Sequence, residues 1–107
     1  MRVAPTTPRL HLFVCANRRA SDSLLGRGCA EAGDAVFDAF KGEVSLRRRV
    51  ADVWITKTHC LGLCPREGAT VASYPEGRFF TEVHTVDARA LLSRELESVS
   101  TLEDDEA

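Results

Sequence analysis

The 107-residue sequence lacks the features that mark membrane, exported and nucleic-acid-binding chains. No apolar run approaches the roughly 20 residues that a membrane-spanning helix needs. The start, MRVAPTTPRLHLFVC, has proline and arginine where a signal peptide has its apolar segment. The formal net charge is −2, so there is no basic excess to attract nucleic acid. We therefore expect a cytoplasmic chain with no membrane or nucleic-acid partner.

The composition also lacks the bias that marks disordered or multidomain chains. Hydrophobic residues make up 44% and charged residues 28%, which is close to ordinary globular usage. A chain of this length fits one domain with one core. We predict a single domain over residues 1–107, in which about 98–107 form an acidic, disordered tail.

Cysteine is scarce, and the four residues present are spaced unevenly. Thirteen residues separate Cys15 from Cys29, whereas only three separate Cys60 from Cys64, in the stretch CLGLC. Thiols stay reduced in the cytoplasm, where purposefully spaced cysteines are more often metal ligands or catalysts than structural disulfides. The sequence therefore predicts that these four thiols bind a metal or take part in catalysis.

The periodicity of the remaining chain predicts the order β α β β β α. Helical spacing of apolar residues runs from Ala30 to about Leu46, and Thr85 is placed to cap the last helix. The strand-like segments share β-branched and aromatic residues and cover 9–15, 50–58, 69–74 and 78–83, with 50–58 expected to be a buried strand. A parallel crossover followed by a hairpin predicts an α/β fold, a thioredoxin-like mixed β-sheet with helices packed on it.

The cysteines follow strands in this arrangement. Cys15 ends the first predicted strand, and Cys60 follows the second. Neighbouring parallel strands end on the same side of a sheet, so the two cysteine loops should meet there. Gly62 and Pro65 disfavour a helix through CLGLC, and a loop lets both of its thiolates turn inward. Four thiols are thus predicted to converge.

Spacing favours one use of four converging thiolates but leaves others open. Zinc sites commonly have two close cysteine pairs, and only Cys60 and Cys64 form one here. A two-iron cluster divides its ligands between two metals and accepts one wide pair, which favours [2Fe-2S]. A zinc-stabilised binding module remains an alternative. So does a thiol–disulfide oxidoreductase, although its usual motif has two residues between the cysteines.

Several stretches resemble the thioredoxin-like [2Fe-2S] ferredoxins, whose fold also occurs in a small subunit of respiratory NADH dehydrogenases. The matching stretches are HLFVCANRR, a following cysteine with a glycine-bearing loop, CLGLCPREG, and ATVASYPEGRFFTEV. Together they cover about residues 10 to 97. Position by position, the family's four cluster ligands match Cys15, Cys29, Cys60 and Cys64.

The resemblance implies a function and partners. It implies a ferredoxin, an electron-transfer protein and not an enzyme, which carries one electron at a [2Fe-2S] cluster between redox protein partners. It also implies a homodimer paired through the sheets. His59 is not expected to be a ligand, because four cysteines already fill the sites. Arg18 and Arg19 lie close to Cys15 in sequence and are expected to steer an acidic partner.

Overall fold

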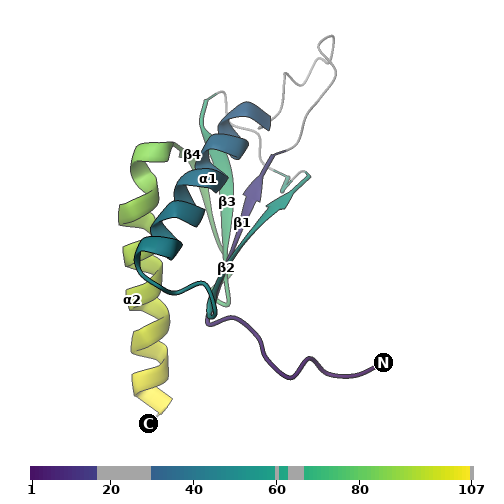
Figure 1. The fold of residues 1–107 in the computed structure, drawn as a ribbon, viewed down its shortest axis with the longest axis vertical. Coiled ribbons are helices and arrows are strands. Elements are labelled where there is room, and N and C mark those ends of the chain that lie inside the picture. Colours follow the sequence, from purple (N-terminus) through teal and green to yellow (C-terminus); the bar gives the residue numbers. More distant parts are fainter. Residues whose placement is uncertain (17–29, 60, 63–66, 107) are drawn as a thin grey trace.

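The strands and helices follow one another in the predicted order in a computed structural model of the chain, which describes residues 1–16, 30–59, 61–62 and 67–106 (Figure 1). A short 3₁₀ turn, η1, precedes the last helix. The elements within these residues are β1 (Leu10–Cys15), α1 (Ala30–Leu46), β2 (Val53–Thr58), β3 (Ala69–Tyr74), β4 (Arg78–Val83), η1 (Thr85–Asp87) and α2 (Ala88–Glu106).

The four described strands form one mixed sheet in the order β2-β1-β3-β4. β1 and β2 are parallel, with Cys15 opposite Thr58, and α1 makes the crossover between them. β3 pairs antiparallel with both β1 and β4. The predicted thioredoxin-like mixed sheet with helices packed on it is therefore confirmed.

Both helices pack on the same face of the sheet. The alternation along β1 directs Leu10, Leu12 and Val14 into the core, because successive side chains of a strand point to opposite faces. The buried residues that meet them from the helices are Val36, Phe40 and Val44 of α1 and Ala88, Leu92, Leu96 and Val99 of α2. The core thus lies in a single layer between the helices and the sheet.

A glycine brings the start of α1 onto the end of β1. A Cβ atom on Gly33 would overlap the carbonyl oxygen of Cys15 and would lie 2.9 Å from the Cα of Ala16. Any larger residue would push the helix away from the strand. Gly33 therefore sets how closely the helix covers the strand end that carries Cys15.

The second strand differs from the prediction in length and in burial. It begins at Val53, because residues 50–52 belong to a turn. Beside that turn, the Arg49 guanidinium donates to both carboxylate oxygens of Asp52, and this hydrogen bonding lowers the pKa of Asp52. The prediction of a buried strand is wrong, because β2 is an edge strand whose Trp54 and Thr56 are exposed.

The last helix also begins differently. Thr85 is the first residue of η1 and not its cap, and His84 precedes it. The Asp87 carboxylate accepts a hydrogen bond of 2.8 Å from the His84 backbone N–H. α2 extends to Glu106, and Val99 is the last of its core residues for which burial is described. The single domain and the disordered tail stay predictions. None of the described helices is apolar enough over a sufficient length to cross a bilayer.

The sheet face opposite the helices carries an aromatic cluster, which we call the open face: His11, Phe13, Trp54, Tyr74 and Phe79. His11 stacks on Phe13 with ring centroids 4.0 Å apart, and Trp54 meets His11 edge-on at 5.7 Å. The Nε2 atom of His11 lies 2.7 Å from the Thr56 hydroxyl oxygen, and partial burial lowers the pKa of His11. Trp54, Tyr74 and Phe79 remain 40%, 41% and 46% exposed.

Candidate metal centre

Cys15 is the one predicted ligand within the described residues. It ends β1 and is fully buried, with 0% exposure. Its thiol donates a hydrogen bond to the main-chain carbonyl oxygen of His59 at a sulfur–oxygen distance of 3.0 Å. The sulfur therefore lies on the β2 side of β1, at the point where the chain leaves β2 toward CLGLC.

The other three predicted ligands, Cys29, Cys60 and Cys64, lie outside the described residues, as do Arg18 and Arg19. In the sequence, Cys29 directly precedes the first residue of α1, and the two others flank a short described stretch at residues 61–62. The four-cysteine ligand set thus stays a prediction.

The described parts of the two cysteine segments start from the same end of the sheet. β1 and β2 are parallel and in register at Cys15 and Thr58, and the Ala16 N–H donates to the Thr58 carbonyl at 3.0 Å. Gly62 has a φ of +92°, which is incompatible with a regular helix at that residue. The first observation agrees with the prediction that both cysteine segments start from one end of the sheet, and the second agrees with the prediction that CLGLC is not helical.

No competing metal site exists in the part of the chain that the structure describes. There, no three or more His, Cys, Asp or Glu side chains come together in a way that could hold a metal ion. Cys15 forms no disulfide, and its burial does not suit an accessible nucleophilic thiol. The buried thiol at the end of a strand suits the thiolate ligand of a cluster, which is a soft donor that iron accepts.

Sequence reasoning missed one polar group beside Cys15. The Thr58 hydroxyl oxygen is buried and has no hydrogen-bond partner among the described residues. The period of two along β2 could have indicated its position, because it places Thr58 on the same face as Trp54 and Thr56. On β1, Cys15 lies on this same face of the sheet, together with His11 and Phe13.

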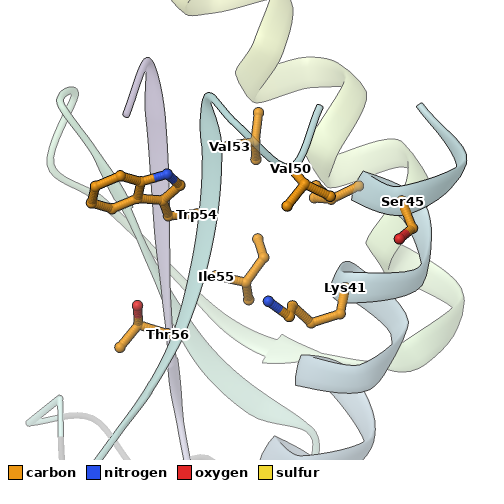
Figure 2. Close-up of a pocket in the computed structure, with 8 residues that line it drawn as sticks. Lys41, Ser45, Val50, Val53, Trp54, Ile55 and Thr56 are labelled. Carbon is orange, nitrogen blue, oxygen red and sulfur yellow. The ribbon is translucent and has the colours of Figure 1, made fainter. Parts of the chain in front are cut away.

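A groove beside β2 lies away from the cysteine end of the sheet (Figure 2). Its volume is about 490 Å³, and its wall comes from α1, the following turn and the first half of β2. The lining residues are Lys41, Val44, Ser45, Val50, Val53, Trp54, Ile55 and Thr56. Since none of these is a cysteine, histidine or carboxylate, the groove is not the metal centre.

Comparison with known proteins supports the family resemblance. No family model matches the chain. A curated protein described as "Ferredoxin, 2Fe-2S", from Clostridium pasteurianum, is 26% identical over 91 residues, which cover 85% of this chain and 88% of that protein. The similarity therefore extends over most of both chains.

Solved structures agree. The wild-type thioredoxin-like [2Fe-2S] ferredoxin from Aquifex aeolicus has a TM-score of 0.73 and 26% identity, covering 86% of this chain and 88% of that one. A cysteine-to-serine variant of the same protein also gives a TM-score of 0.73 and 26% identity, with coverage of 83% and 88%. The resemblance drawn from the cysteine motifs is thereby confirmed.

Proposed function

This chain resembles the thioredoxin-like [2Fe-2S] ferredoxins in both sequence and fold, and from that premise we propose that it is a ferredoxin. When bound, a [2Fe-2S] cluster accepts one electron from a reduced partner and passes it to an oxidised one. We propose that the chain is an electron carrier and not an enzyme, with no substrate chemistry of its own. The partners are redox proteins.

We propose Cys15, Cys29, Cys60 and Cys64 as the ligands. The observation that carries this assignment is the placement of Cys15, which is buried at the end of β1 directly beside the strand that leads into Cys60 and Cys64. Cys29 directly precedes α1 in the sequence, and α1 packs against Cys15 through Gly33. The contribution of the chain is to hold and shield these thiolates.

Metal analysis of freshly purified protein tests the function. We expect a reddish-brown sample that bleaches partly with dithionite and contains about two irons and two acid-labile sulfides per chain. Colourless protein that holds only zinc would establish the zinc-stabilised module instead. Metal-free protein with a redox-active cysteine pair would establish the thiol–disulfide oxidoreductase.

We also propose a homodimer that pairs through the open face. Three large aromatic side chains, Trp54, Tyr74 and Phe79, are each about two-fifths or more exposed on one side of the sheet. A contiguous apolar patch of this kind is typical of a protein–protein interface. Pairing through this face would leave the end of the sheet that carries Cys15 available to redox partners.

A charge placed in the open face should dissociate this dimer. We expect wild-type protein to sediment as a dimer at micromolar concentration and Trp54→Glu as a monomer, because the interface would have to bury the new carboxylate. Val86→Glu is the matched control, since Val86 is also a large exposed hydrophobic residue but lies on η1. Wild-type protein that sediments as a monomer would disprove the dimer.

We place the protein in the cytoplasm. The ligands must be free thiolates, and the reducing conditions of that compartment keep cysteines from forming disulfides before a cluster is assembled. Cys15 is a free thiol in the structure.

A further inference from the structure

Thr58 carries a buried hydroxyl at the edge of the proposed metal centre. Its Oγ1 atom is inaccessible to solvent and has no hydrogen-bond partner among the described residues. Leaving a buried hydroxyl unpaired costs about 1–3 kcal/mol, and most such groups in folded proteins are paired. With Cys15 present as a thiol, none of the described residues therefore supplies the acceptor that this hydroxyl needs.

The neighbouring strand β1 places Cys15 opposite Thr58. Thr58 and Cys15 are direct partners in the parallel ladder and share one face of the sheet. Adjacent strands are about 4.8 Å apart, so the two side chains start from neighbouring points. The Cys15 sulfur also leans toward β2, because it lies 3.0 Å from the carbonyl oxygen of His59, the residue after Thr58.

Deprotonation of Cys15 changes which partners suit its sulfur. As a thiol, Cys15 donates its proton to the His59 carbonyl. As a thiolate ligand it has no proton and can only accept hydrogen bonds, so the His59 carbonyl ceases to be a partner. The Thr58 hydroxyl is a donor, and its proton turns about the Cβ–Oγ1 bond to suit an acceptor.

We infer that the Thr58 hydroxyl donates a hydrogen bond to the Cys15 sulfur when Cys15 is a cluster ligand, and that this bond raises the reduction potential. The inference rests on the proposed function. Reduction adds one electron and no proton to the centre, so the sulfur ligands become more electron-rich and accept hydrogen bonds more strongly. A donor at Cys15 therefore stabilises the reduced state more than the oxidised state.

Removal of the hydroxyl should lower the midpoint potential. Valine has nearly the shape of threonine without the oxygen, and we expect Thr58→Val to disfavour reduction about tenfold, which is 59 mV for one electron. Thr58→Ser keeps the hydroxyl and should stay near the wild-type value. Thr56→Val is the matched control. It removes a hydroxyl from the same face of β2, but that hydroxyl is hydrogen-bonded to His11 and not to Cys15.

The measurement is a spectroelectrochemical titration of the four proteins, with iron content and resonance Raman spectra of the iron–cysteine stretches recorded alongside. A lower potential and a shifted Raman band in Thr58→Val alone support the hydrogen bond. A fully loaded Thr58→Val with wild-type potential would overturn it while leaving the proposed function intact. If the wild-type protein contained no iron, the proposed function itself would be disproved.

A variant that loses the cluster is also informative. If Thr58→Val and Thr58→Ala both fail to load iron, Thr58→Ser decides between two explanations. Loading of the serine variant at the wild-type potential shows that the hydroxyl is required and supports the inference. Failure of the serine variant shows that Thr58 acts through its packing, which overturns the inference.

Discussion

Cys60→Ala and Cys29→Ala should each yield folded protein that has lost nearly all of its iron, from about two per chain to near zero. Alanine removes the thiolate and supplies no substitute, so one iron would be left with an incomplete set of ligands. The fold should survive, because the substitutions leave unchanged the described core residues that lie between the helices and the sheet. Iron analysis and visible absorption measure the loss, and circular dichroism checks the fold.

His59→Ala is the matched control for these cysteine variants. His59 adjoins Cys60 in the sequence, but its contact with Cys15 uses the main-chain carbonyl, which alanine retains. We expect this variant to keep its cluster. The ligand assignment would be wrong if His59→Ala abolished the visible spectrum while Cys29→Ala preserved it.

Arg78→Met should destabilise the fold by about 2 kcal/mol, which is below the range for a fully buried ion pair because the Arg78 side chain is 38% exposed. Glu95 of α2 is fully buried, with 0% exposure, and its Oε2 atom lies 3.3 Å from a terminal guanidinium nitrogen of Arg78. The same nitrogen donates to the Ser98 hydroxyl at 2.6 Å. Without Arg78, the buried Glu95 carboxylate would lose this cation. Urea unfolding at neutral pH measures the effect.

Two further variants test this explanation. Arg89 also bridges a helix to a neighbouring element, since it pairs with Glu43 at 3.3 Å, but its side chain is 74% exposed. Arg89→Met should therefore cost less than about 1 kcal/mol. Combining Arg78→Met with Glu95→Leu should restore most of the lost stability, because no buried charge then remains. Equal losses for Arg78→Met and Arg89→Met would contradict the explanation.

Local patterns in the sequence were sufficient for the order of the elements and for many of their bounds. The helix Ala30–Leu46 and the hairpin strands 69–74 and 78–83 match the structure residue for residue. Apolar periodicity and the Pro-Glu-Gly turn signal act over a few residues, so they do not depend on the rest of the fold. Where the signal was weaker, around residues 50–52 and Thr85, the boundary predictions were wrong.

The candidate site was predictable to a similar extent. Cysteine spacing and position after strands predicted converging thiols, and the structure agrees for the strand ends around Cys15 and Thr58. The Thr58 hydroxyl was missed because a threonine in a strand ordinarily signals only β propensity. Glu95 was missed too, since the stretch SRELES resembles a solvent-exposed helix surface.

The sequence by itself determined which segments become strands and helices, and which residue types are available to bind a metal. These properties depend on backbone preferences and on donor chemistry that each segment carries alone. Only the tertiary structure decided that β2 lies at an edge, that both helices cover one face and leave Trp54 exposed on the other, and that Glu95 is buried against Arg78. Burial and pairing depend on which segments meet in space, and residues distant in the chain determine that.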